Sequence, residues 1–232
     1  MVFNITECVD FHHGKRIVIT ILVCGHDVVI IMHKEGDALL IQQPVYYPFR
    51  EVIEDNGRIF VNNQLHYEDG KYTIDFEDFE KKIVDNNVKV FILCNPHNPV
   101  GRVWTKEELE KMGDICLKHN VVIMDDEIHC DFTYPGFKFT SFMTLDEKYH
   151  NSLVLYTSPS KTFNVAGLQP ANIIIKNPEL RAAYRKANAA AGYSQGSIMG
   201  QVAVKSVYTK GDEWVNELVE YITGNMNYMR DF

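Results

Sequence analysis

Short apolar runs recur along the chain and are separated by more polar segments. Several of these runs are continuously apolar rather than alternating, which is typical of strands that are covered on both faces of a sheet. The predicted strands are residues 16 to 23, 27 to 32, 38 to 42, 58 to 62, 89 to 94, 121 to 124, 153 to 157 and 171 to 175.

Helical periodicity fills the longer segments between these runs. The predicted helices are residues 75 to 85, 106 to 119, and 178 to the C-terminus with breaks near Gly192 and Gly211. The second helix has a clear start, because Thr105 followed by Glu108 makes a capping box. Strands that alternate with helices in this way predict an α/β sandwich with a largely parallel sheet. The last helical pattern reaches the C-terminus without a glycine cap, so we expect a further domain to be missing.

Composition and charge narrow the classes of protein. The chain has 232 residues, of which 46% are hydrophobic and 23% are charged, as in a globular protein with a substantial core. The net charge of -8 comes from acids spread along the sequence, and no Lys/Arg-rich block is present, which argues against a nucleic-acid partner. The most apolar stretch, residues 17 to 32, is broken by His26 and Asp27, so we expect no membrane span and no signal peptide.

The five cysteines are odd in number and widely scattered, and no two of them form a CxxC pair. This pattern predicts neither a disulfide framework nor a zinc site, and we expect no metal centre. A reducing cytoplasm is the location that fits it best.

Polar residues stand at or shortly after the ends of three predicted strands: Asn95, Asp126 and Lys161. In an open parallel sheet, ligands bind in the crevice beyond the carboxyl ends of the strands. A lysine amine forms a Schiff base with an aldehyde, a carboxylate keeps a pyridine nitrogen protonated, and an amide donates to a phenolate oxygen. Pyridoxal 5'-phosphate (PLP) needs all three groups.

Each member of this trio also has an ordinary interpretation. Lys161 taken alone is a solvated surface lysine, Asn95 is a turn residue in an Asn-Pro pair, and Asp126 is a strand-end carboxylate. Three acids in series, Asp125 to Glu127, are costly to bury unless a proton or cation is shared, and we expect Asp125 and Glu127 to be structural or solvated.

Four segments carry a resemblance to a known family: "PVYYPF", "CNPHNPVGRVWTKEEL", "DDEIHCDF" and "SPSKTFNVAGLQPANIII". Together they closely resemble the fold-type I PLP-dependent enzymes of the class I/II aminotransferase superfamily. Within it, the chain looks most like the cystathionine β-lyase-like (C-S lyase) branch, from about residue 35 to the C-terminus. The implied fold is the α/β/α large domain of a PLP-dependent transferase, with a mostly parallel sheet.

The resemblance implies a role for each matching residue. Lys161 is the Schiff-base lysine and the later proton carrier, Asp126 holds the proton of the pyridine nitrogen, and Asn95 bonds the phenolate oxygen. The remaining cofactor-binding residues are Tyr46, which stacks on the ring, Ser158 and Ser160, which bond the phosphate, and His129, which lies near the phenolate oxygen. Tyr47 competes with Tyr46 for the stacking role, and either tyrosine alone is an ordinary core residue. A lone His129 is most simply a core histidine.

Two departures from the family pattern bear on function and on domain organisation. Gln169 stands where many aminotransferases have an arginine that holds the phosphate, and the lyase branch tends to have glutamine there. Residues 1 to 35 lack the expected phosphate-binding turn, and the stretch "VITILVCGHDVVIIMHKEGD" that stands in its place is apolar and β-branched around Gly25. We therefore interpret residues 1 to 35 as a divergent N-terminal segment and residues 36 to 232 as the PLP-binding large domain, with the C-terminal small domain absent.

The resemblance implies a PLP-dependent β-lyase that cleaves cystathionine or a related L-cysteine S-conjugate to pyruvate, ammonia and a thiol. A homodimer is also implied. An aminotransferase with the same trio, or a truncated relative that binds cofactor or a partner without turnover, remains open. A nucleotide-binding domain is disfavoured because neither GxGxxG nor GxxxxGK[ST] follows a strand.

Overall fold

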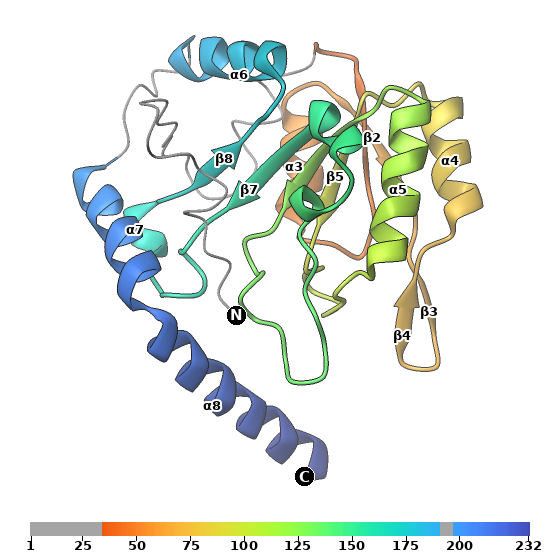
Figure 1. Cartoon of the computed structure of the whole chain (residues 1–232). Coiled ribbons are helices and arrows are strands. Elements are labelled where there is room, and N and C mark those ends of the chain that lie inside the picture. The colour runs from red at the N-terminus through yellow and green to blue at the C-terminus, as the bar shows by residue number, and fades with distance from the viewer. Residues whose placement is uncertain (1–33, 191–196) are drawn as a thin grey trace.

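The centre of the molecule is a six-stranded sheet in a computed structural model that describes residues 34 to 190 and 197 to 232 (Figure 1). Its strand order is β2-β1-β5-β6-β7-β8, and every neighbouring pair is parallel except β7 and β8. The strands are β1 (Ala38–Ile41), β2 (Ile59–Asn62), β5 (Val90–Cys94), β6 (Val122–Asp126), β7 (Leu153–Thr157) and β8 (Asn172–Ile174). The predicted largely parallel sheet is confirmed. The predicted strands at 16 to 23 and 27 to 32 lie outside the described residues.

Helices cover both faces of this sheet. On one face, α4 (Phe76–Asp85) and α5 (Lys106–Lys118) bury side chains such as Phe79 and Leu109 against Phe91 of β5. On the other face, α3 (Pro48–Asp55) and α6 (Pro178–Ala190) bury Val52 and Tyr184 against the opposite side chains of the same strands. Successive strand residues point to opposite faces, so a continuously apolar strand supplies both cores. The predicted α/β/α sandwich is confirmed.

The capping box predicted at the start of α5 is present. The main-chain N–H of Glu108 donates to Thr105 Oγ1 over 3.2 Å, and the N–H of Thr105 donates to Glu108 Oε2 over 2.8 Å. Glu108 also accepts two hydrogen bonds of 2.7 Å from the Arg102 guanidinium. The turn after β5 is therefore tied to the first turn of α5 by an ion pair in which one guanidinium nitrogen contacts both carboxylate oxygens.

Besides three short 3-10 helices, two features of the chain were not predicted. One is α3, in which Pro48 occupies the first turn and Phe49, Val52 and Ile53 form the buried stripe. The other is an exposed hairpin of β3 (His66–Glu68) and β4 (Lys71–Thr73). Three short 3-10 helices, η2 (Phe142–Thr144), η3 (Glu147–Ser152) and η4 (Ala166–Leu168), complete the connections around the sheet.

The C-terminal helical segment is broken at Gly211, as predicted. Gly211 ends α7 (Ile198–Lys210) and begins α8 (Asp212–Asp231), and a β-carbon at this position would overlap the ring of Phe163. The predicted break near Gly192 lies outside the described residues. In Figure 1, α8 runs away from the sheet toward the C-terminus.

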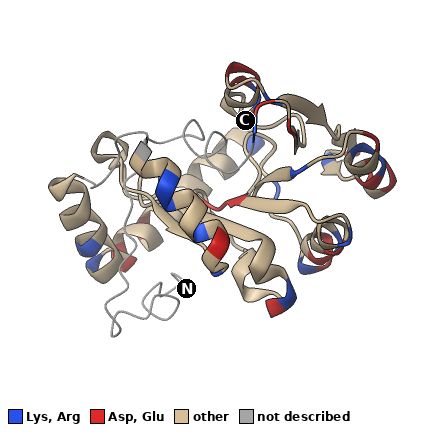
Figure 2. Cartoon of the chain, turned by 90° about the horizontal axis from the view of Figure 1, so that it is seen from above, with Lys and Arg blue, Asp and Glu red and all other residues tan. Residues whose placement is uncertain are grey.

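Charges are mixed over the surface of the molecule. Figure 2 shows acidic and basic residues beside one another on the outer helices. Within the part of the chain that the structure describes, every helix is too short or too polar to cross a membrane.

Candidate active site

The carboxyl ends of β5, β6 and β7 lie at one edge of the sheet. The register pairs Cys94 with Asp126, and Asp126 with Tyr156, so these parallel strands end side by side. The residues at these strand ends and in the turns that follow are therefore brought together. The structure thus places Asn95, Asp126 and the turn that contains Lys161 at the same edge, as the sequence predicted.

Asp126 is partly buried at the end of β6. Its Oδ1 accepts a hydrogen bond of 3.1 Å from the main-chain N–H of Ile128. Burial raises the pKa of Asp126 to about 6, while the Ile128 N–H and the charge of Lys161 act in the opposite direction. A carboxylate whose pKa is raised by burial is stabilised by a proton or cation placed against it. A protonated ring nitrogen would be such a cation.

Asn95 is fully buried and oriented by the chain around it. Its Nδ2 donates to the carbonyl of Thr140 over 3.1 Å, which leaves a second N–H on the same nitrogen. Its Oδ1 is buried and has no hydrogen-bond partner among residues 34 to 190 and 197 to 232. A buried amide with unused hydrogen-bonding capacity fits a polar ligand atom at this edge.

Lys161 and His129 stand beside Asp126. Lys161 is exposed at the turn after β7. Burial lowers the pKa of His129, and the charge of Lys161 lowers it further, so this imidazole is neutral near pH 7. His129 follows β6 in the same loop and lies 6.1 Å from the ring of Phe132, measured between ring centroids.

The two tyrosines after β1 differ in burial. Tyr46 is partly buried and packs edge-to-face on Phe49, with ring centroids 5.7 Å apart. Tyr47 is 71% exposed. Because β1 lies beside β5 and runs parallel to it, both tyrosines follow a strand that ends at the same edge. The stacking role of Tyr46 stays a prediction.

Ser158 and Ser160 are buried within the turn that carries Lys161. Their hydroxyl oxygens lie 2.6 Å apart, and the N–H of Ser160 donates to Ser158 Oγ over 3.0 Å. Both hydroxyls also lie within hydrogen-bonding distance of the Pro170 carbonyl. Their predicted role as phosphate ligands stays a prediction. The neighbouring Gln169 is exposed and adopts a left-handed conformation with φ of 53°.

Asp125 and Glu127 point to the opposite face of β6 from Asp126, as alternation along a strand requires. Both are buried, and the pKa of each lies above its usual value. Burial is the main cause for both, and the charge of Glu127 adds to it at Asp125. Glu127 Oε1 accepts a hydrogen bond of 2.9 Å from the N–H of Phe142, so we assign the shared proton to Asp125. The structural interpretation of these two acids is therefore the correct one.

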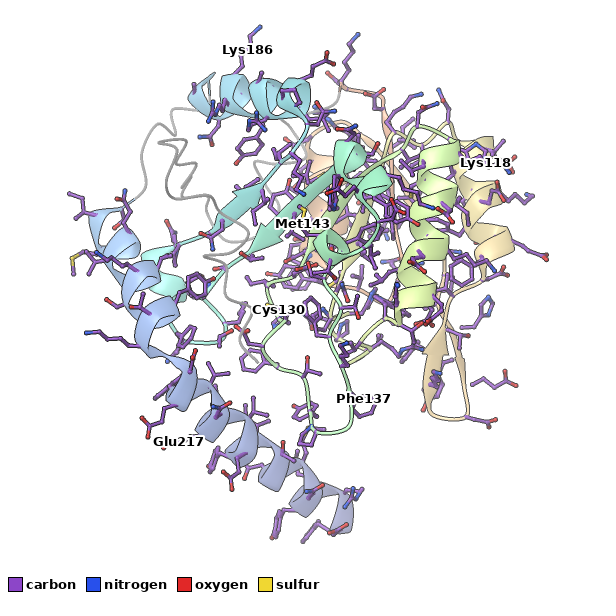
Figure 3. The ribbon with its side chains drawn as sticks, in the orientation of Figure 1. Lys118, Cys130, Phe137, Met143, Lys186 and Glu217 are labelled. Carbon is purple, nitrogen blue, oxygen red and sulfur yellow. The ribbon has the colours of Figure 1, made fainter. Side chains whose placement is uncertain are left out.

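A cavity of about 440 Å³ lies between the loop after β6, the end of β7 and α8. Cys130 and Phe137 line it from the loop, and Val215 lines it from the helix. Figure 3 shows Cys130 and Phe137 along this loop. Its lining includes Asp131 and Ser158 but, within the described part of the chain, not Asn95, Asp126 or Lys161, so the cavity adjoins the turn that carries Lys161 without containing the converging side chains. No cluster of three or more His, Cys, Asp or Glu side chains suited to a metal ion occurs in that same part of the chain.

Sequence reasoning did not identify Thr140, Asp131 and Thr162 as supports of this site. Thr140 orients Asn95, and the Thr162 hydroxyl donates to Asp131 Oδ2 over 2.8 Å. Each contact joins residues that are far apart in the sequence, so spacing carried no signal for it. Only the position of Thr162 directly after Lys161 pointed to this residue.

Comparison with known proteins identifies the family. A model described as aminotransferase class I and II matches residues 24 to 231. The chain belongs to this family. The predicted superfamily is thus confirmed, and the match includes every residue of the converging trio.

Several members of the aminotransferase class I and II family are similar to the chain. It is 44% identical over 197 residues to cystathionine beta-lyase PatB of Bacillus subtilis (strain 168), covering 85% of this chain and 51% of PatB. It is 32% identical over 200 residues to protein MalY of Escherichia coli (strain K12), covering 84% of this chain and 50% of MalY. The chain spans about half the length of the curated relatives it matches.

Solved structures give the same fold. Cystalysin from Treponema denticola, whose crystal structure contains pyridoxal 5'-phosphate, superposes with a TM-score of 0.86 and 39% identity, covering 89% of this chain and 52% of cystalysin. The PLP-bound C-S lyase from Staphylococcus hominis superposes with a TM-score of 0.85 and 32% identity, covering 99% of this chain and 58% of the lyase. The predicted fold of the PLP-dependent transferases is confirmed.

Proposed function

We propose that this chain carries the PLP site of a carbon–sulfur β-lyase. The substrate is cystathionine or a related L-cysteine S-conjugate, and the products are pyruvate, ammonia and a thiol. The observation that carries the proposal is the convergence of Asn95, Asp126 and Lys161 at one sheet edge. Residues 36 to 232 form the cofactor-binding domain in this proposal.

Each residue of the trio has one task. Asp126, whose pKa burial raises to about 6, is ionised when it pairs with the protonated ring nitrogen and holds that proton in place. Asn95 uses its second N–H on the phenolate oxygen while Thr140 fixes the amide plane. Lys161 would hold the cofactor covalently, and its amine, once displaced by the amino group of the substrate, would take the proton from the substrate's α-carbon. The bound cofactor supplies the electron sink for this reaction.

The remaining predicted residues surround these three. Tyr46 covers the ring from the strand beside β5, and His129 presents a neutral imidazole near the phenolate oxygen. Ser158 and Ser160 hold the phosphate, for which they must exchange their present contact with the Pro170 carbonyl. Gln169 in place of an arginine favours the lyase over an aminotransferase.

The protein is also proposed to be a cytoplasmic homodimer. Large apolar side chains are exposed on both C-terminal helices: Ile198, Met199 and Val202 on α7, and Trp214, Tyr221, Tyr228 and Met229 on α8. Apolar groups gathered in this way are typical of a protein interface. The cysteines of the described segments, Cys94, Cys116 and Cys130, are free thiols, which supports a reducing compartment.

The test is a pyruvate assay on the chain with added PLP and cystathionine. We expect pyruvate, ammonia and thiol in equal amounts, and a loss of about 10³-fold or more in Lys161→Ala, which removes the acid–base group. Lys186→Ala, which changes an exposed lysine on α6, is the matched control (Figure 3). Amino transfer that depends on a keto acid and yields no pyruvate would replace the lyase with an aminotransferase. If neither pyruvate formation nor amino transfer is detected, the lyase assignment would be replaced with a non-catalytic relative.

A further inference from the structure

The residue after Lys161 is held more firmly than the lysine itself. Lys161 is exposed, whereas Thr162 is 1% exposed. The Thr162 hydroxyl donates to Asp131 Oδ2 over 2.8 Å, and its carbonyl accepts from Trp214 Nε1 over 3.3 Å. The main chain next to Lys161 is therefore fixed by two hydrogen bonds, one to the loop after β6 and one to α8.

The junction of α7 and α8 supports the same turn at the next residue. The ring of Phe163 lies against Gly211, where any β-carbon would overlap it. The same ring meets Tyr208 of α7 edge-to-face, with centroids 6.4 Å apart. Glycine is needed at 211 for this close approach, so the junction fits the turn closely.

Asp131 connects this turn to the rest of the site. It follows Asp126 and His129 in the loop after β6, and it lies 31 residues before Thr162. A hydroxyl donor paired with a carboxylate makes a short and strong hydrogen bond. One such bond therefore joins the loop of Asp126 and His129 to the turn of Lys161.

We propose that Asp131 is a positioning residue that holds Lys161 against Asp126 and His129 through the hydroxyl of Thr162. The proposal rests on the function proposed above and adds to it a residue outside the cofactor-binding set. Asp131 acts through Thr162, and neither residue is assigned a contact with cofactor or substrate. Trp214 on α8 donates a hydrogen bond to the carbonyl of Thr162 and further restrains this residue.

The effect follows from geometry. The Lys161 amine must reach both the cofactor aldehyde and the α-proton of the substrate. A displacement of about 1 Å in a reacting group can lower a rate by about 10²-fold. Loss of the Thr162–Asp131 bond should therefore lower kcat and slow the attachment of cofactor to Lys161, and leave the KM for substrate nearly unchanged.

The experiment measures attachment without any turnover. The 232-residue chain is mixed with PLP, and the growth of the visible band is timed; borohydride reduction and peptide mapping then locate the label. We expect Thr162→Val to attach PLP about tenfold more slowly than the unchanged protein, and Thr162→Ser, which keeps the hydroxyl, to stay within about twofold. Asp131→Asn, which keeps an acceptor oxygen but loses the charge, should fall between them.

Asp114→Asn is the matched control. Asp114 accepts a hydroxyl hydrogen bond of the same length, 2.8 Å, from Tyr149, and it lies on α5 rather than at the strand ends. We expect Asp114→Asn to attach PLP to Lys161 at the same rate as the unchanged protein. If Thr162→Val fails to fold, as judged by circular dichroism, the comparison is made with Asp131→Asn.

The outcomes separate this proposal from the proposed function. A folded Thr162→Val or Asp131→Asn protein that attaches PLP to Lys161 at the unchanged rate overturns the positioning role. Slower attachment with rescue by Thr162→Ser supports that role even if the chain makes no pyruvate, in which case the lyase function alone fails. An unchanged protein that does not label at Lys161 overturns both.

Discussion

The main-chain N–H of Asn95 donates to the main-chain carbonyl of Asp126 over 3.0 Å. This hydrogen bond continues the pairing of β5 with β6 by one residue beyond the last strand position. The amide and the carboxylate of the site are thus set by the sheet register rather than by a flexible loop. A site built on rigid strand ends keeps its geometry before a ligand arrives.

Replacing the carboxylate at the end of β6 should lower lyase activity even when the cofactor is saturating. Asp126→Asn keeps the shape of the side chain and removes the charge that we propose to pair with the protonated ring nitrogen. We expect lyase activity to fall by about 10²-fold or more, since electrostatic stabilisation of the developing charge is lost. Pyruvate formation at saturating PLP measures this, with Asp212→Asn on the exposed start of α8 as the control. Equal activity in Asp126→Asn would refute the role of this carboxylate.

The buried pair of Asp125 and Glu127 should give the protein a pH-dependent stability. Burial raises the pKa of Glu127 to about 7, and the pKa of Asp125 also lies well above its usual value. Between the ordinary carboxyl pKa of about 4 and the raised values, the folded protein binds more protons than the unfolded chain. The free energy of unfolding therefore falls as pH rises through this window, by about 1 kcal/mol per pH unit for each proton retained.

The variant Asp125→Asn isolates this effect. It keeps the shape of the side chain and removes one of the two titrating groups, so the fall in stability between about pH 5 and 7 should become shallower. Urea denaturation at several pH values, without cofactor, measures the slope. Asp114→Asn is the control, because Lys148 lowers the pKa of Asp114 and its contribution lies below this window. An unchanged slope in Asp125→Asn would mean that the pair shares no proton.

Sequence patterns predicted the sheet and the trio because both depend on local rules. The runs ending before Asn95, Asp126 and Ser158 are continuously apolar, and the crevice rule then selects the polar residues at their carboxyl ends. Helix α3 was missed although Phe49, Val52 and Ile53 have helical spacing, because the segment is only eight residues long. The hairpin of β3 and β4 is exposed and lacks apolar alternation, and the Asp69–Gly70 turn was its only local signal.

The hydrogen bonds that orient the site residues could not be predicted from the sequence in the same way. The bonds from Asn95 to Thr140 and from Thr162 to Asp131 join residues that are 45 and 31 positions apart. Such contacts depend on the packing of loops that sequence periodicity does not describe. The burial of Asp125 and Glu127 was left open as well: alternation along β6 places both on the face opposite to Asp126, but the sequence did not decide between structural and solvated acids.

Trp104 should stabilise both the core and the end of β5 that carries Asn95. Its ring is fully buried, its Nε1 donates to the Cys94 carbonyl over 3.0 Å, and Cys94 directly precedes Asn95. Trp104→Phe removes this donor and leaves a small void, so we expect the free energy of unfolding to fall by about 2 kcal/mol or more. Thermal or urea denaturation measures the loss. Tyr67→Phe in the exposed hairpin is the control and should change stability by less than about 0.5 kcal/mol.

If Trp104→Phe lowers only the free energy of unfolding and leaves PLP affinity unchanged, the role of Trp104 is limited to the core. If Trp104 also fixes the end of β5, PLP affinity should fall in the same variant under conditions where the protein remains folded. Titration of the visible band with PLP separates the two results.

The convergence of Asn95, Asp126 and Lys161 is tested most directly by locating the cofactor on the chain. The purified protein is incubated with PLP, its visible absorption is recorded, and the modified peptide is mapped after borohydride reduction. We expect a visible band and a single label on Lys161 that is strongly reduced in Asp126→Asn. A label spread over exposed lysines such as Lys118 and Lys186, with no band, would contradict it.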